Sequence, residues 1–234
     1  MTDWKKIFKM FAETDEHKAK VQKAQNIIRK ALHTSKKPYI AYSGGKDSTC
    51  VLQLVLQQKP DIMVLHWDYG RYYIPRPLAQ ELVDNAIEIG AKNIRIETSA
   101  KYEELKRNAV NVLGEDFLGK LLPRLKQEGY DLCFLGLRAQ ESVKRKRKLK
   151  TRGVFWKESG FLNCAPIANW TWQDVWAYIF GNNLPYASVY DLYVPVVGWD
   201  KVRLTTFFDP EFEKLGNRNV DSALMWRFKG GLEQ

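Results

Sequence analysis

The chain of 234 residues contains 45% hydrophobic and 27% charged residues, which is typical of a soluble globular protein and excludes a disordered or fibrous one. Its formal net charge of +10 predicts a polyanionic partner, such as a nucleotide, a sulfated substrate or a nucleic acid. No stretch approaches the roughly 20 apolar residues of a membrane span, and residues 1–6 lack the apolar core of a signal peptide, so we expect a cytoplasmic protein without membrane contact.

The three cysteines, Cys50, Cys133 and Cys164, lie far apart and form no Cys-x-x-Cys pair. This spacing indicates neither a zinc site nor a disulfide framework. We therefore expect reduced and mostly buried thiols, with Cys164 at a buried strand end rather than in a reactive position.

Hydrophobic periodicity predicts helices that alternate with short strands. Strands are predicted at residues 39–42, 62–66, 93–97 and 132–135. Helices are predicted over 13–32, after Gly45 with Asp47 or Ser48 as the cap, and over 78–89, 102–112, 117–128 and 171–180. This order predicts a mostly parallel α/β sheet with right-handed crossovers.

Three loops follow the carboxyl ends of predicted strands, at residues 43–48, 66–70 and 136–142. Ligands of parallel α/β sheets bind beyond these strand ends, so we expect the three loops to converge on one rim. Beyond residue 150 the chain shows short apolar pieces and turns, with one clear helix that Thr171 and Asp174 can cap as a capping box.

The stretch YSGGKDST, Tyr42 to Thr49, has the chemistry of a phosphate cradle between a strand and a helix. Glycines let backbone N–H groups approach oxygens, and the helix N-terminus adds partial positive charge. Lys46 can neutralise a phosphate, and Asp47 can hold Mg²⁺. The stretch matches neither a Walker A sequence nor Gly-x-Gly-x-x-Gly, and a simple tight turn is the alternative.

This stretch resembles the PP-loop of the adenine-nucleotide alpha-hydrolase superfamily, whose members bind ATP and release pyrophosphate while activating a substrate as its adenylate. The resemblance implies a three-layer fold with a five-stranded, mostly parallel twisted sheet and helices on both faces. It places the adenine near the end of the second strand, where His66 and Asp68 are candidates. It also implies phosphate binding by Ser43, Gly44, Gly45, Lys46, Asp47 and Ser48.

Two further segments resemble the phosphoadenosine phosphosulfate (PAPS) reductase family. They read GLRAQESVKRK, from residue 136, and CAPIANWTWQDVWAYI, from residue 164, followed by LPYASVYD. The likeness spans about residues 38–191. It adds Gly136 to the nucleotide-binding candidates, and it implies anion or substrate binding by Arg138, Glu141 and Ser142. From the basic run that follows, Arg145 and Arg152 are further candidates for anion binding.

The run Lys144 to Arg152 contains seven basic residues and no acid. A solvated basic helix or a mobile loop is one interpretation, and contact with a nucleic-acid backbone is another. The fork of Arg138, two residues past a strand end, can grip a phosphate or sulfate bidentately.

The C-terminal part departs from the PAPS reductase pattern. Members of that family carry a reactive cysteine in a Glu-Cys-Gly-x-His tail, whereas here no cysteine follows Cys164 and the region GWDKVRLTTFF offers Thr205 and Thr206. A hydroxyl cannot replace a low-pKa thiolate in reductive chemistry. We therefore expect no iron–sulfur cluster and no reductase activity of the usual kind.

The leading hypothesis is an ATP pyrophosphatase that transfers an adenylyl group to sulfate or nucleic acid, with Lys46 and Arg138 as catalytic residues and Mg²⁺ as cofactor. One alternative is a PAPS or adenosine 5'-phosphosulfate (APS) reductase that uses Cys164 or a partner protein's thiol, and another is a non-catalytic binding module. We expect a helical extension over 1–35, a nucleotide-binding α/β domain over 36–195 and a tail over 196–234 packed on it. Homodimers are common in the family that the chain resembles.

Overall fold

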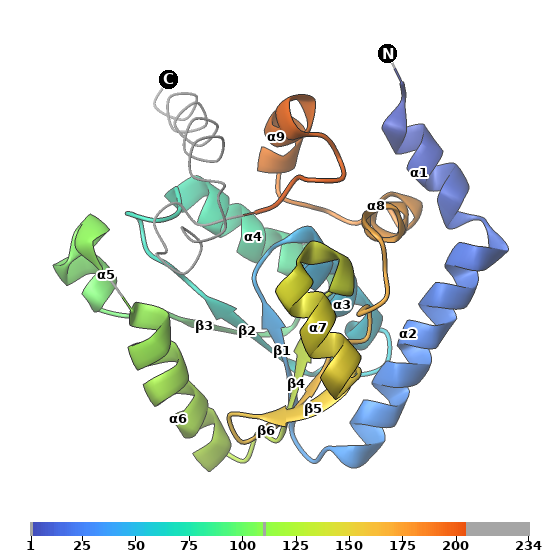
Figure 1. The fold of residues 1–234 in the computed structure, drawn as a ribbon. Coiled ribbons are helices and arrows are strands. Elements are labelled where there is room, and N and C mark those ends of the chain that lie inside the picture. The colour runs from blue at the N-terminus through green and yellow to red at the C-terminus, as the bar shows by residue number, and fades with distance from the viewer. Residues whose placement is uncertain (1, 110, 205–234) are drawn as a thin grey trace.

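Six strands form one sheet in the part of the chain that the computed structural model describes, residues 2–109 and 111–204 (Figure 1). The spatial order is β3-β2-β1-β4-β6-β5, in which β5 alone is antiparallel to its neighbour. The bounds are β1 Pro38–Tyr42, β2 Met63–Trp67, β3 Asn93–Glu97, β4 Leu132–Leu135, β5 Phe155–Glu158 and β6 Phe161–Cys164. The predicted mostly parallel α/β fold is confirmed, with β5 as an additional antiparallel edge strand.

Helices cover both faces of the sheet (Figure 1). One face packs against α2 Asp15–Thr34, α3 Lys46–Leu56, α4 Arg76–Ile89 and α8 Trp172–Gly181. The other face packs against α6 Leu122–Gln127 and α7 Val143–Arg152. Strand β2 is buried along its whole length, as expected for a strand with helices on both sides.

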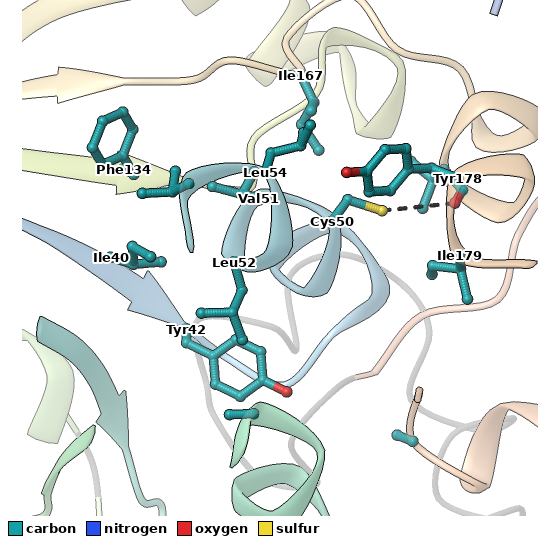
Figure 2. Close-up of a cluster of buried hydrophobic side chains, with 14 of the residues drawn as sticks. Ile40, Tyr42, Cys50, Val51, Leu52, Leu54, Phe134, Ile167, Tyr178 and Ile179 are labelled. Atoms are coloured by element: carbon teal, nitrogen blue, oxygen red, sulfur yellow. Dashed lines mark hydrogen bonds between the residues drawn. The ribbon is translucent and has the colours of Figure 1, made fainter. Parts of the chain in front are cut away.

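Helix α3 lies between the sheet and α8 (Figure 2). Its side chains Val51, Leu52 and Leu54 are fully buried beside Ile40 and Phe134 of the central strands. This placement fixes the N-terminus of α3, and therefore the glycine loop before it, at the carboxyl edge of β1.

Several predicted helix bounds are wrong. The predicted helix over 102–112 is instead α5 Lys101–Glu104 and a 3₁₀ turn Lys106–Asn108, and a π-helical segment Leu113–Leu121 begins just beyond it. Lys106 and Asn111 have φ values of 51° and 57°, and residues in this left-handed region cannot continue a right-handed helix. The predicted cap at Asp47 or Ser48 is also wrong, because α3 begins at Lys46 with Gly45 as its N-cap.

The helical extension predicted over residues 1–35 was not divided into α1 Trp4–Ala12 and α2, and the sequence patterns did not indicate β5 or α9 Val189–Val197. Helix α1 packs on α8 through aromatic rings, including Phe8 stacked on Phe180 at 5.8 Å. No helix in the described ranges is both long and apolar enough to cross a membrane.

A buried polar cluster joins α2 to α8. Thr171 and Asp174 form the predicted capping box, and the Asp174 carboxylate also accepts from Lys20 Nζ at 3.1 Å and lies 3.6 Å from His17 Nδ1. The Asp174 side chain is 0% exposed. Burial opposes its charge, but the nearby His17 ring and the hydrogen bonds from Thr171 and Lys20 outweigh burial and lower the pKa of Asp174 to about 2.

We predict that Asp174 makes the stability of the protein sensitive to acid. An unfolded Asp titrates near pH 4, so the stabilisation is present above about pH 4 and is lost as the pH falls towards 2, by on the order of 2 kcal/mol. Urea unfolding at pH 2–6 should give a flatter pH dependence for Asp174→Asn than for the wild type. Replacement of the exposed Asp84 by Asn should keep the wild-type dependence, and equal curves for all three proteins would contradict the assignment.

Candidate functional site

The glycine loop, residues 43–45, links β1 to α3 and is held by its own hydroxyl groups. Ser48 Oγ donates to the Gly45 carbonyl at 2.8 Å and lies 3.1 Å from Ser43 Oγ. Gly44 has a φ of +76°, and a Cβ there would lie 2.6 Å from Leu82 Cδ1. The position therefore requires glycine, both for its backbone conformation and for the close approach of α4.

Gly136, at the end of β4, packs directly on the start of α3. A Cβ at this position would lie 2.7 Å from the backbone nitrogen of Ser48 and 2.8 Å from the carbonyl carbon of Asp47. The absence of a side chain thus lets the chain after β4 run against the glycine loop. The structure brings these two predicted loops together at the carboxyl edge of the sheet.

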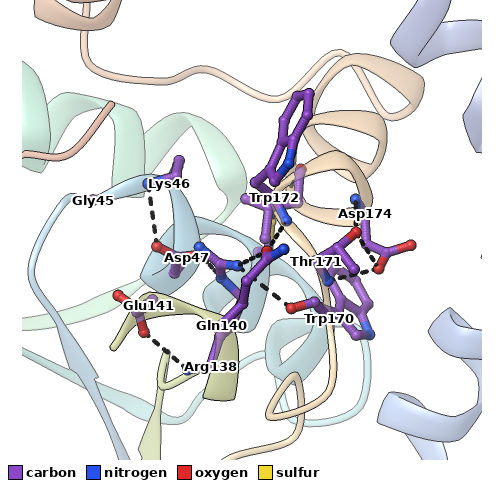
Figure 3. Close-up of polar contacts among 12 residues, drawn as sticks. Gly45, Lys46, Asp47, Arg138, Gln140, Glu141, Trp170, Thr171, Trp172 and Asp174 are labelled. Atoms are coloured by element: carbon purple, nitrogen blue, oxygen red, sulfur yellow. Dashed lines mark hydrogen bonds and ion pairs between the residues drawn. The ribbon is translucent and has the colours of Figure 1, made fainter. Parts of the chain in front are cut away.

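Three charged side chains meet at this contact. The Arg138 guanidinium donates through Nε to Asp47 Oδ1, and Lys46 Nζ lies 3.5 Å from Asp47 Oδ2 (Figure 3). Lys46 and Arg138 are each only 4% exposed. Burial opposes the charge of Asp47, but the two cations outweigh it and lower the pKa of its carboxyl, whereas burial lowers the pKa of Lys46 despite the attraction of Asp47.

Arg138 is held on several sides by the protein. Its Nη1 donates to Gln140 Oε1 at 3.3 Å and to the Trp170 carbonyl at 3.4 Å, and its backbone N–H donates to Glu141 Oε2 at 2.9 Å (Figure 3). These contacts orient the guanidinium toward Asp47. They leave it little freedom to act as the direct anion clamp that its sequence position suggests.

The candidates Glu141, Ser142 and Arg145 lie next to this network. Glu141 pairs with Arg145, and Ser142 Oγ caps α7 by accepting from the backbone N–H of Arg145 at 3.2 Å. Arg152 lies elsewhere: it pairs with Glu158 at 2.8 Å, and Glu158 is opposite Phe161 at the far end of the sheet from the glycine loop. The structure therefore does not bring Arg152 to the site.

His66 and Asp68, from the second predicted loop, are engaged in local contacts. His66 is buried with Nδ1 3.0 Å from the Tyr42 carbonyl. Asp68 forms a bidentate pair with Arg76 at 2.8 and 2.9 Å and accepts from the backbone N–H of Gly70 at 2.8 Å. Both residues lie at the end of β2, beside the end of β1 from which the glycine loop starts.

Sequence reasoning missed the residues that cover the loop. The backbone N–H of Lys46 donates to Tyr190 Oη at 3.0 Å, and Lys46 Nζ donates to the Val202 carbonyl at 2.8 Å. Arg203 Nη2 donates to the Glu141 carbonyl at 2.6 Å. Tyr190 lies within the motif LPYASVYD and could have been considered, but a contact made by the backbone of Val202 leaves no sequence signal. The Thr205 and Thr206 candidates lie outside the described residues.

All three cysteines are buried, as predicted, and Cys164 ends β6. Cys50 Sγ points to the Val175 carbonyl of α8 at 3.6 Å (Figure 2). Burial raises the pKa of Cys133 to about 12 and raises the pKa values of Cys50 and Cys164 as well. None of the three is therefore an accessible thiolate at neutral pH.

Comparison with known proteins identifies the family. Residues 37–217 match the phosphoadenosine phosphosulfate reductase domain. The chain belongs to the PAPS reductase family.

One relative is an uncharacterized protein of Methanocaldococcus jannaschii, which is 28% identical to this chain over 211 residues. The match covers 84% of this chain and 41% of the relative. This chain thus matches less than half of that relative's length. The adenosine 5'-phosphosulfate reductase of Bacillus mycoides is 25% identical over 210 residues, which are 86% of each chain.

Two solved structures have the same fold as this chain. PAPS reductase from Candida auris, in a phosphate complex, has a TM-score of 0.51 at 19% identity and covers 82% of this chain and 92% of its own. The U34-tRNA thiolase NcsA from Methanococcus maripaludis, with its 4Fe-4S cluster, has a TM-score of 0.52 at 17% identity. The match covers 74% of this chain and 66% of the thiolase.

We predict that Gly136→Ala destabilises the protein and displaces the loop, because the added methyl group would meet backbone atoms at 2.7–2.9 Å. The expected cost is about 1–3 kcal/mol, as for other overpacked interiors. Gly119→Ala is the control, because its Cβ would meet only the Gly114 carbonyl at 3.4 Å. Urea unfolding should give a lower free energy of unfolding for Gly136→Ala than for Gly119→Ala. Equal values would contradict the prediction, because the backbone of α3 would then make room for the methyl group at little cost.

Proposed function

We propose that this chain binds ATP at residues 43–48 and transfers the adenylyl group to an anionic acceptor with release of pyrophosphate. The observation that carries the proposal is Lys46, a buried cation at the N-terminus of α3. Among the residues that the structure describes, its ammonium group contacts the Asp47 carboxylate, which it shares with Arg138, and the neutral Val202 carbonyl, and it lies 5.7 Å from the centre of the Tyr190 ring. Because a buried cation is costly unless an anion compensates it, a polyphosphate in place of the Val202 carbonyl would be favourable.

In this reaction an acceptor oxygen attacks the α-phosphorus of ATP, and the bond from that phosphorus to the oxygen bridging to the β-phosphorus breaks. Both electrons of that bond leave with pyrophosphate. Lys46 and the dipole of α3 would stabilise the growing negative charge on the leaving group. Ser43 and Ser48 place their hydroxyl groups along the loop. These hydroxyls would donate hydrogen bonds to the same phosphates.

We assign Arg138 a positioning role rather than direct contact with the acceptor. It holds Asp47, which in turn lies beside the Lys46 ammonium. Removal of the guanidinium would leave a buried carboxylate facing Lys46 alone, and Lys46 would then be drawn to Asp47 instead of to a phosphate.

The arrangement of Asp47 does not fit the predicted magnesium ligand. Both of its carboxylate oxygens face cations, Arg138 on one side and Lys46 on the other. Asp47 is therefore assigned to the ion pairs with Arg138 and Lys46 rather than to Mg²⁺.

Reduction of PAPS or APS is the second candidate, favoured by the likeness to the reductase of Bacillus mycoides. The chain's own cysteines do not support it, because all three are buried with raised pKa values. Cys133 and Cys164 also face opposite sides of the sheet, an arrangement unsuited to holding one iron–sulfur cluster. A reductase reaction would therefore require a thiol other than these three.

We predict that the purified protein converts α-labelled ATP to AMP or an adenylylated acceptor, and that Lys46→Ala lowers the rate by about 100-fold or more, as for loss of one electrostatic stabiliser. The assay contains MgCl₂ and is run with sulfate, with RNA and without an acceptor. Lys59→Ala, which removes a partly exposed lysine paired with Asp61, should retain the wild-type rate.

Failure of the wild type to bind or turn over ATP, or an unchanged rate for Lys46→Ala, would contradict the proposal. Thiol-dependent release of sulfite from APS or PAPS by the same preparation would favour the second candidate instead.

A further inference from the structure

Helix α7 is the most basic element that the structure describes. Its ten residues, VKRKRKLKTR, include seven cations and no acid. The helix starts at the loop network and runs past β5 toward the far end of the sheet (Figure 1). The predicted basic run is therefore a helix, and its side chains divide into two groups.

The first group is neutralised or packed against the protein. Arg145 pairs with Glu141, and Lys148 and Arg152 both pair with Glu158, at 2.7 and 2.8 Å. Leu149 packs in the small apolar cluster of Trp156. At 100° per residue these four side chains fall within one third of the helix circumference, the third that faces the protein.

The second group points away from the protein. Lys144, Lys146, Arg147 and Lys150 are exposed, and within the described part of the chain they have no ion pair and no hydrogen bond from their side chains. At 100° per residue Lys146, Arg147 and Lys150 fall within about 100° of the helix circumference, and Lys144 lies about 60° beyond Arg147. At 1.5 Å per residue the four cations span about 9 Å along the axis.

We infer that this face of α7 binds the sugar–phosphate backbone of a nucleic acid. A row of unpaired cations without an intervening acid matches a polymer that carries charge at regular intervals. A lipid surface fits poorly, because Val143, 67% exposed, is the only apolar side chain on this face. The four cations would contact phosphates and would not recognise a base sequence.

The position of α7 links this surface to the glycine loop. Ser142 caps the helix, and Glu141 immediately before it binds both Arg145 and the backbone of Arg138, which holds Asp47. A nucleic-acid strand that lies along α7 would therefore have one end beside the glycine loop. Where the inference concerns the acceptor of the adenylyl group, it rests on the proposed function. It favours nucleic acid over sulfate as that acceptor.

The test measures binding of a fluorescent 20-nucleotide RNA and of the matched single-stranded DNA by anisotropy, without ATP, over a range of salt concentrations. Four contacts at about 0.7 per phosphate predict a log–log salt slope near −3 for the wild type. The triple variant Lys146→Gln, Arg147→Gln, Lys150→Gln should bind at least tenfold more weakly and have a slope about 2 units smaller. Glutamine preserves helix propensity, so α7 should remain folded.

The control removes three exposed lysines elsewhere, Lys6→Gln, Lys23→Gln and Lys92→Gln, with the same loss of net charge. It should keep most of the wild-type affinity. Equal losses for both triple variants would overturn the inference, because binding would then depend on net charge alone. Equally tight and salt-sensitive binding of poly-glutamate would overturn the nucleic-acid assignment in favour of an acidic protein.

Failure of this inference and failure of the proposed function are distinguishable. Nucleic-acid binding that maps to α7 in a protein without ATP turnover would support the surface and refute the adenylyl transfer. ATP turnover with sulfate in a protein that binds neither RNA nor DNA would overturn the surface and leave the proposed function standing.

Discussion

The buried contact between Asp47 and Arg138 holds the candidate site together. It joins the first turn of α3 to the chain that leaves β4, and Lys46 lies beside it with 4% of its surface exposed. A lone buried charge would be costly, so the two cations and the carboxylate stabilise one another. The same contact requires the absence of a side chain at Gly136, because the two backbone segments approach too closely for a Cβ.

Sequence reasoning predicted the parts of this arrangement that depend on local patterns. Alternating helices and strands gave the sheet, and the carboxyl-edge rule placed the loops at Ser43 and Gly136 together. Arg138 was identified from its position after β4, but its partner was not, since an ion pair between residues 91 positions apart leaves no periodic signal. The cover formed by Tyr190 and the Val202 carbonyl was missed for the same reason.

The same limits explain the errors in secondary structure. The chain between β3 and β4 carries helical periodicity, yet left-handed residues at Lys106 and Asn111 break it into short pieces. The basic run after Ser142 was open between a solvated helix and a mobile loop, and the structure shows the helix, with Glu141 and Glu158 neutralising one side of it. Tertiary partners therefore decided what local propensity left open.

We propose that the loop around Lys46 binds the pyrophosphate portion of ATP. Calorimetric titration of the wild-type protein with ATP, pyrophosphate and AMP would test this assignment. ATP and pyrophosphate should compete for one site, and AMP should bind at least tenfold more weakly, a difference of about 1.4 kcal/mol. Equal affinities for ATP and AMP, with no competition by pyrophosphate, would contradict it.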